Sequence, residues 1–323
     1  MSRSRLYRDG VLETEDFPVD EISEHLADPA VVVWLDLCDP TEDDFASLGD
    51  ELGLHRLAVE DALHARQRPK VDRYDKHCFL NVYAVRFDSG PGRLDTSEVS
   101  AFITERVLVT VHQTGHFDID AVTRRWDDAD SPAKAGVGFL VHGLLDYVVD
   151  SQFDAVQALD DQLEALEDLV FDDSATHAAV QQRSVRLRKC LVTLRRVVLP
   201  MREVVDTLTR GDLQIVGEEL APYFQDVHDH VRHASEWTDS LRELVATIRE
   251  TQLAVQGNRL NIIMKKVTSW AAVIAVPTAI SGFYGQNVPY PGFEQPWGFW
   301  VSTVAIVVVS GGLYAIFKRR GWL

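Results

Sequence analysis

Two long apolar runs near the end of the chain dominate its hydrophobic pattern. Val267 to Tyr284 and Phe299 to Phe317 hold 18 and 19 residues without one Asp, Glu, Lys or Arg. Because a helix rises about 1.5 Å per residue, each run would reach roughly 27 Å, close to the thickness of the hydrocarbon core of a bilayer. A buried helix of a soluble protein usually keeps a polar face, which neither run shows. The pattern therefore predicts a transmembrane hairpin.

The charges that flank the runs predict the orientation of this hairpin. Lys265 and Lys266 precede the first run, basic residues follow the second at 318–320, and Glu294 is the one charged residue of the loop between them. By the positive-inside rule, both chain ends lie in the cytoplasm and the loop faces outward. We therefore expect a multi-pass protein of the plasma membrane, which is the inner membrane in a bacterial-type cell.

Upstream of the runs, apolar residues recur every three or four positions and predict long amphipathic helices. One is expected from Val149 to Val170, and a basic second helix from Thr176 to Leu199 pairs with this acidic predecessor as an antiparallel hairpin. The apolar stripe of the second helix is expected to hold Val180, Val185, Leu187, Leu191, Leu194 and Val198. A third helix starts near Phe224 and meets no proline until Pro277, so it enters the first uncharged run. About fifty helical residues would reach roughly 75 Å, and association of several copies would cover the exposed stripe.

The first 130 residues alternate short strand-like runs with helical ones. The expected strands are Ala30–Leu37, Cys78–Phe87, Glu98–Thr104 and Arg106–His112. Thr41 with Asp44 three residues later predicts the start of a helix, and a further short helix is expected from Val59 to Ala65. This alternation predicts an α/β domain with a mixed or antiparallel sheet.

These patterns together predict an α+β chain with four parts. A cytoplasmic α/β domain occupies residues 1–130 and a cytoplasmic helical hairpin residues 131–222. A stalk helix at 223–266 continues into the membrane, and a transmembrane hairpin with a basic tail occupies 267–323.

Charge and cysteine content narrow the class of protein. The formal net charge is −18, and the first 260 residues hold 27 Lys and Arg against 49 Asp and Glu, a net charge of −22. Such a field repels nucleic acid and concentrates cations. The three cysteines are scattered and suggest neither a disulfide framework nor a zinc site. No Walker loop, HExxH or GxSxG motif is present, so we expect a membrane protein that is not an enzyme. The N-terminus lacks a long apolar segment after a basic patch, so no signal peptide is expected.

The outer end of the first run reads Tyr284-Gly285-Gln286-Asn287, and here the chain resembles a known family. The CorA family of divalent cation channels carries Tyr-Gly-Met-Asn at this point, between two C-terminal membrane helices. Four further segments resemble family segments in the same order: Val59–Asp61 with Gln67–Lys70, Leu199–Glu203, Asn261–Thr268, and the basic ending from Lys318. The resemblance covers the whole chain and implies a homopentameric channel of identical subunits, gated by cytoplasmic metal.

One departure from the family pattern bears on the ion. The middle Met of the signature is Gln286 here, and the zinc-associated ZntB branch also differs from the main group at this position. Mg²⁺ is the default as transported and regulatory ion, while Zn²⁺, Co²⁺ and Ni²⁺ stay open. The runner-up is a ZntB-like zinc, cobalt or nickel transporter. An alternative from another functional class is an acidic cytoplasmic sensor or scaffold that the hairpin only anchors in the membrane.

The signature residues suit the outer mouth of a channel for hydrated Mg²⁺. This ion dehydrates reluctantly, so neutral amide and carbonyl oxygens suit it better than a cage of carboxylates. The Asn287 side chain, with backbone oxygens of Tyr284 and Gly285, would form such a ring around a common axis, and Gly285 would let the chain leave the helix sharply. Alone, Gly-Gln-Asn is an ordinary turn sequence.

Five residues of the stalk and first run lie near one helix face and are candidates for the pore lining. They are Asn261, Met264, Val267, Thr278 and Gly282. By resemblance, Asn261 would form a polar ring at the inner mouth, and Met264 with Val267 a hydrophobic constriction that closes by dewetting. Packing between helices is the rival interpretation of each position.

Acidic and histidine residues at the start of the stalk are candidates for a metal sensor. Asp226, His230 and His233 fall at i, i+4 and i+7 on one helix face, beside Asp229. A solvated helix face is the alternative. By resemblance, Asp226 is an intersubunit metal-sensing carboxylate whose partner from a neighbouring chain is Asp88, so that occupied pairs would hold the pore shut.

Overall fold

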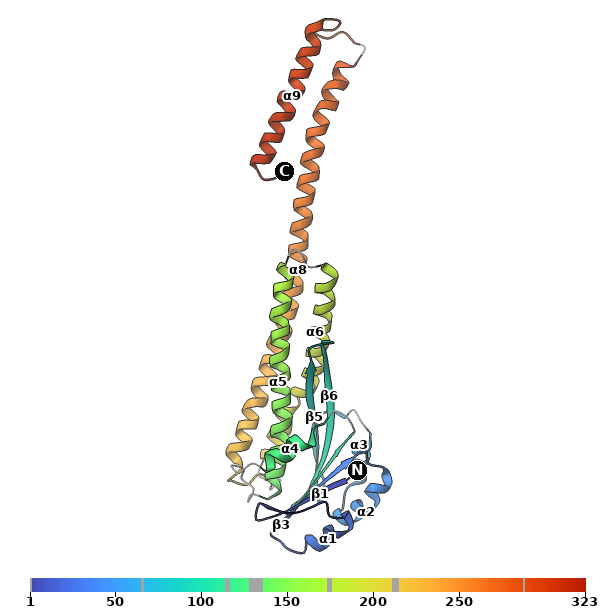
Figure 1. The fold of residues 1–323 in the computed structure, drawn as a ribbon, viewed down its shortest axis with the longest axis vertical. Coiled ribbons are helices and arrows are strands. Elements are labelled where there is room, and N and C mark those ends of the chain that lie inside the picture. Colours follow the sequence, from blue (N-terminus) through green and yellow to red (C-terminus); the bar gives the residue numbers. More distant parts are fainter. Residues whose placement is uncertain are drawn as a thin grey trace. The chain divides into compact units, whose positions relative to one another are not determined.

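The computed structural model describes residues 2–64, 67–113, 117–127, 136–172, 176–210, 215–286 and 288–323. The chain divides into two compact units, Met1–Ala246 and Thr247–Leu323. Each unit is described on its own (Figure 1). Helix α8, Ala221–Tyr284, contributes its first part to the first unit and its remainder to the second.

The first unit is built on one mixed sheet, with seven strands among the described residues in the order β2-β1-β3-β7-β6-β5-β4. The strands are β1 Ser2–Arg8, β2 Val11–Glu15, β3 Val31–Cys38, β4 Lys70–Arg73, β5 Cys78–Asp88, β6 Arg93–Ile103 and β7 Val107–His112. β3 and β7 run parallel, whereas the other neighbouring pairs are antiparallel. The predicted mixed sheet is confirmed.

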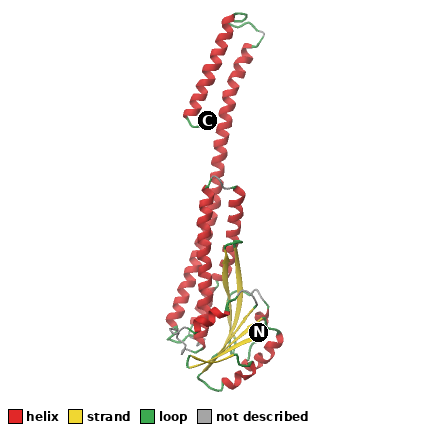
Figure 2. Cartoon of the chain, viewed as in Figure 1, coloured by secondary structure: helices red, strands yellow, loops and turns green. Residues whose placement is uncertain are grey.

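Helices cover both faces of this sheet (Figure 2). Those of the first unit are α1 Ile22–His25, preceded by the 3-10 turn Val19–Glu21, α2 Glu42–Leu52, α3 Arg56–Leu63, α4 Ile119–Trp126, α5 Val137–Phe171, α6 His177–Val198 and α7 Met201–Thr209. Alternation along β5 explains the layering, because successive side chains of a strand point to opposite faces. Leu80 and Val82 pack in one core with Leu144 of α5 and Val227 of α8, whereas Phe79 packs in the other with Leu48 of α2.

The structure shows side-chain caps at two of the predicted helix starts. Thr41 and Asp44 form the capping box that begins α2. The Thr176 hydroxyl accepts a hydrogen bond from the Ala179 N–H at the start of α6. Both starts are therefore confirmed at the residues that the sequence indicates.

The hairpin of α5 and α6 differs from the prediction in two respects. Val185, expected in the buried stripe of α6, is 48% exposed. The guanidinium of Arg195 on the basic helix α6 lies 2.8 Å from the Asp239 carboxylate, so this residue pairs with α8 and not with the acidic helix α5. Asp239 also contacts Arg242 one turn further along α8. The position of α8 in the first unit thus changes the ion pairing that the sequence suggests.

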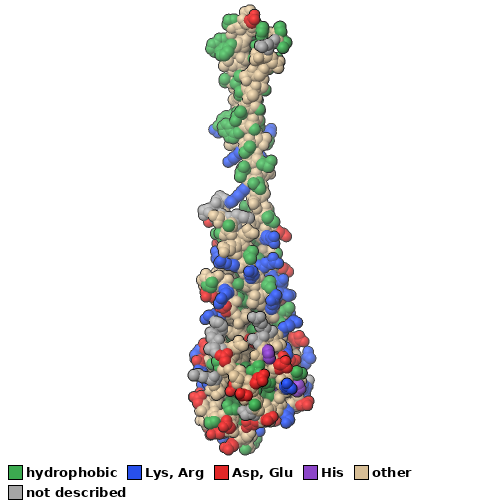
Figure 3. Space-filling model, turned by 90° about the vertical axis from the view of Figure 1, so that its right-hand side faces the viewer, with side chains coloured by type: hydrophobic (Ala, Val, Ile, Leu, Met, Phe, Trp, Pro, Cys, Tyr) green, Lys and Arg blue, Asp and Glu red, His purple; other side chains and the backbone are tan. Residues whose placement is uncertain are grey.

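The second unit consists of the rest of α8, a loop, and α9, Pro296–Arg319. Both helices contain a window long and apolar enough to cross a membrane, and these windows are 6% and 0% buried. Figure 3 shows charged side chains over the first unit and very few over these windows. Pro277 lies inside α8 without ending it. The two predicted apolar runs are confirmed as helical.

Candidate functional site

The C-terminal end of α8 is held by backbone hydrogen bonds. The helix ends at Tyr284, and the Gly285 N–H donates to the Ser281 carbonyl at 2.8 Å. The chain leaves the helix at Gly285 without a left-handed φ at this residue. A β-carbon at Gly285 would lie 3.0 Å from the Ser281 oxygen, so crowding is what favours a glycine. Asn287 lies outside the described residues.

Aromatic residues fix the loop that follows. The Tyr290 hydroxyl donates to the Tyr284 carbonyl at 2.9 Å, and the two rings meet edge to face with centroids 5.0 Å apart. Phe293 packs against the Tyr290 ring in the same manner, at 5.4 Å. Further along, Gly292 has a φ of +93°, and a β-carbon at Gly298 would overlap the Gly292 carbonyl oxygen. The loop therefore folds back onto its own ends and is locally well specified.

One face of α8 in the second unit is less exposed than the rest. It is marked by Ser269, Ala272, Val273, Val276, Ile280 and Tyr284. Helix α9 supplies a matching face that includes Ser310, and the Trp270 and Tyr314 rings lie 6.3 Å apart. Ser269 is 1% exposed. These observations define the side of α8 that packs on α9.

Four of the five predicted pore residues lie on the opposite side of α8, whereas the helical period places Asn261 about 100° from Thr278 and so to one side of this face. Thr278 follows Ser269 by nine residues, about two and a half turns at 3.6 residues per turn, which places it about 180° away. Met264 and Gly282 are separated by 18 residues, five whole turns, and Val267 precedes Thr278 by about three turns. All four residues are exposed. The structure thus leaves their shared face free of contact with α9.

The hydroxyl of Thr278 is oriented by its own helix. Pro277 has no N–H to donate, and one residue later Thr278 Oγ1 donates to the Ile274 carbonyl at 3.1 Å. With its proton committed to the backbone, this oxygen can offer lone pairs outward. An exposed acceptor of this kind can contact the hydration shell of a cation.

At the start of α8 the structure brings two of the predicted sensor residues together. His230 Nδ1 lies 3.8 Å from Asp226 Oδ2. His233 instead stacks on Trp237, with centroids 5.7 Å apart, and Asp229 faces Arg232 at 3.7 Å. Within the described parts of the single chain, no group of three or more His, Cys, Asp or Glu residues is placed to hold a metal.

The other predicted sensor residue, Asp88, ends β5. Its Oδ1 accepts a hydrogen bond from the Gly90 N–H at 3.0 Å, in the turn between β5 and β6. An Asp side chain that caps its own turn in this way is held in a defined orientation. Asp88 as a whole is exposed.

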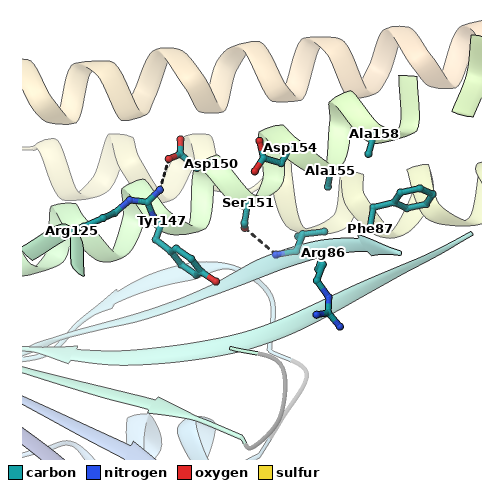
Figure 4. Close-up of a pocket in the computed structure, with 10 residues that line it drawn as sticks. Arg86, Phe87, Arg125, Tyr147, Asp150, Ser151, Asp154, Ala155 and Ala158 are labelled. Carbon is teal, nitrogen blue, oxygen red and sulfur yellow. Dashed lines mark hydrogen bonds and ion pairs between the residues drawn. The ribbon is translucent and has the colours of Figure 1, made fainter. Parts of the chain in front are cut away.

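A cavity that was not predicted from the sequence lies between β5 and α5, and its charged lining residues are Arg86, Arg125, Asp150 and Asp154 (Figure 4). It measures about 380 Å³, and Asp150 and Asp154 line it together with Arg125, which lies 2.5 Å from Asp150. Burial raises the pKa of Asp150, and the charge of Asp146 raises this pKa further against the effect of Arg125. The signal in the sequence is the spacing of Asp146, Asp150 and Asp154 by four residues, which places them on one helix face.

Comparisons with known proteins agree with this architecture. The sequence model of the family described as CorA-like Mg²⁺ transporter protein matches residues 29–319. The cobalt/magnesium transport protein CorA of Thermotoga maritima is 27% identical over 299 residues, which cover 92% of this chain and 85% of that protein. The putative metal ion transporter YfjQ of Bacillus subtilis is 29% identical over 290 residues, 90% of this chain and 89% of the relative.

A solved structure shares the fold along the whole chain. The CorA magnesium transporter of Methanocaldococcus jannaschii superposes with a TM-score of 0.79 at 24% identity, over 100% of this chain and 99% of that one. The α/β unit, the long helix and the two apolar helices therefore form a known arrangement. Together with the family match over 29–319, this shows that the chain belongs to the family of CorA-like Mg²⁺ transporter proteins.

Proposed function

We propose that the chain forms a homopentameric channel in the plasma membrane that carries divalent cations, in the first place Mg²⁺, down their electrochemical gradient. The observation that carries this proposal is the uncovered face of α8 opposite α9. Several copies that meet along this face would enclose an axis lined by Met264, Val267, Thr278 and Gly282. Asn261, three residues before Met264, would line the inner mouth.

The outer mouth is formed by Tyr284, Gly285, Gln286 and Asn287. Four neutral residues supply amide and carbonyl oxygens that hold an ion through its water shell. The membrane potential supplies about 4.6 kcal/mol per 100 mV for a divalent ion, so transport needs no ATP. In this arrangement the loop faces outward and both chain ends lie in the cytoplasm, as the basic residues beside each span favour.

Cytoplasmic metal gates the channel through Asp88 and Asp226 of neighbouring subunits, with Asp229 and His230 beside them. Cations that bridge these carboxylates hold the subunits together, and loss of the cations lets like charges repel. The exposure of Asp88 and Asp226 in the single chain supports this role, since both carboxylates are accessible to another subunit.

A second candidate is a zinc transporter, which the Gln286 departure from the usual Met favours. Uptake into proteoliposomes distinguishes the two readings when Mg²⁺, Zn²⁺, Co²⁺ and Ni²⁺ are compared at equal concentration. Preference for Zn²⁺ would exclude Mg²⁺ as the main cargo. In the same preparation, light scattering in mild detergent is expected to give five copies of the 36.3 kDa chain, and a monomer would contradict the channel.

The decisive variant is Asn287→Ala. We expect Mg²⁺ flux into proteoliposomes to fall to the level of empty vesicles, because the amide ring at the mouth is lost. Asn258→Ala is the matched control: Asn258 is exposed on α8, and the helical period places it on the same side as the face that packs on α9. Equal flux through both variants would favour a membrane-anchored protein that does not transport.

A further inference from the structure

A second cavity in the first unit is distinct from the proposed ion path and from the cavity between β5 and α5. It measures about 380 Å³ and lies between the β5–β6 turn and the hairpin of α5 and α6. Gly90 and Gly92 of the turn line one side. The turn is fixed against α6, because the Cys190 thiol donates to the Gly92 carbonyl at 3.5 Å. The cavity is thus bounded by elements that are packed in place.

The floor of this cavity is apolar. Leu159 of α5 and Leu187 of α6 are 0% and 4% exposed, and Phe87 of β5 lies beside them. Side chains of this kind favour the hydrocarbon part of a ligand over water. Most small-molecule sites combine such a floor with a few polar groups that converge at the mouth.

The polar groups at the mouth are positively charged. Arg183 Nη2 donates to Gln162 Oε1 at 3.1 Å, which holds this guanidinium across the gap between α6 and α5. Arg186, one turn away, lines the same cavity and has no hydrogen-bond or ion-pair partner within the described part of the chain. Arg188 and Lys189 follow on the exposed surface of α6. A cation is therefore disfavoured here, although the first 260 residues are strongly acidic overall.

We propose that this cavity binds a small organic anion, a carboxylate with a short apolar chain. The carboxylate pairs with Arg186 and Arg183, whose planar guanidinium groups match its two oxygens, and the chain lies on Leu159 and Leu187. A cavity of about 380 Å³ lies at the small end of the range of small-molecule pockets, about 300–1,000 Å³, so a short chain is what it suits. The ligand would touch the turn next to Asp88 and so stabilise the packing of β5 and β6 on α6.

The probe for this site is hexanoate, titrated by calorimetry into the full chain in lipid nanodiscs, with empty nanodiscs as the blank. Two comparison compounds each keep one feature of hexanoate. Hexanol has the apolar chain without the charge, and inorganic phosphate has negative charge without the chain. We expect saturable binding of hexanoate, and neither comparison compound should saturate at the same concentration. Binding is measured without ion flux, so failure of this proposal is distinguishable from failure of the channel proposal.

Two pairs of variants locate the site. Arg186→Gln should weaken hexanoate binding about tenfold, because a charge-assisted pair is lost, whereas Arg188→Gln should bind as the parent does. Ala179→Leu places a larger side chain in the cavity and should abolish binding, whereas Ala178→Leu, exposed on the same turn, should not. Unchanged binding by either cavity variant, or no saturable binding by the parent, would overturn the proposal. Melting temperature and oligomer size show that each variant is folded.

Discussion

The Tyr290 hydroxyl donates a hydrogen bond to the carbonyl oxygen of Tyr284, the last residue of α8, at 2.9 Å. This carbonyl is one of those that we propose for the outer mouth of the channel. A carbonyl oxygen accepts two hydrogen bonds, so the contact leaves one lone pair for a hydrated ion. Tyr290 therefore acts as a positioning residue that fixes the direction of the carbonyl.

Tyr290→Phe removes this hydrogen bond and keeps the aromatic packing. We expect a local loss of about 1 kcal/mol and a reduced Mg²⁺ flux in proteoliposomes, without loss of the oligomer. Tyr314→Phe is the matched control, because the Tyr314 ring packs near Trp270 of α8, away from the loop. Equal flux through the two variants would show that Tyr290 does not orient the mouth.

The close approach of Gly298 to Gly292 yields a second prediction. A β-carbon at position 298 would overlap the Gly292 carbonyl oxygen, and Gly292 itself needs a left-handed φ of +93°. Gly298→Ala should therefore cost about 1–3 kcal/mol through overpacking and lower the melting temperature of the purified protein. Gly311→Ala in the same helix meets no atom within 4 Å and is expected to be tolerated. Equal melting temperatures for both variants would contradict the tight loop.

Apolar periodicity was enough to predict the long helices and the central strands. β5 and β7 match the expected runs because their apolar residues are nearly continuous. β6 begins at Arg93, five residues before the expected start at Glu98, because its polar first half pairs with β5 and carries no apolar signal of its own. β1, Ser2–Arg8, was missed because its Ser and Arg residues resemble a solvated end, and only pairing with β3 makes it a strand. α5 begins at Val137, earlier than predicted, since its first turns are buried on several sides and show no polar face.

The parts of the site that could be predicted are those that residues close together in the sequence determine. The helical period alone places Met264, Val267, Thr278 and Gly282 on one face, and the structure adds that α9 covers the other. The Tyr290 hydrogen bond, the cavity at Asp150 and the cavity at Arg186 depend on segments brought together by the fold. The spacing of Asp146, Asp150 and Asp154 indicates one helix face, but no local pattern encodes which strand or helix packs beside it.

The proposed sensor makes a prediction about inhibition by Mg²⁺ on the cytoplasmic side. Asp226→Asn removes one carboxylate of the intersubunit pair, and divalent affinity depends on the number of charged ligands. We expect the Mg²⁺ concentration that halves the flux to rise about tenfold. Glu236→Gln, an exposed carboxylate further along α8, should leave that concentration unchanged. An identical dose response for the two variants would exclude Asp226 from the sensor.

A buried pair on β3 and β7 predicts how stability depends on pH. His112 Nε2 lies 3.1 Å from Asp36 Oδ2, and His112 Nδ1 faces the Gln113 carbonyl at 3.4 Å. The other Asp36 oxygen accepts from Thr110 Oγ1 at 2.6 Å. Burial by itself would lower the pKa of His112, but the hydrogen bond and charge of Asp36 outweigh burial and raise this pKa, with a smaller contribution from Asp39.

Because the folded pKa of His112 lies above its unfolded value of about 6.5, its contribution to stability is fully present below that pH and is lost as pH rises through the folded pKa. His112→Gln stays neutral, so the melting-temperature difference between parent and variant should shrink from pH 6 to pH 8. Burial lowers the pKa of His77 and of His142. Their titration makes stability rise with pH in the parent and in the variant alike, so this effect cancels in the difference. A difference that is constant over this range, or that grows with pH, would show that the protonated imidazole does not stabilise the sheet at Asp36.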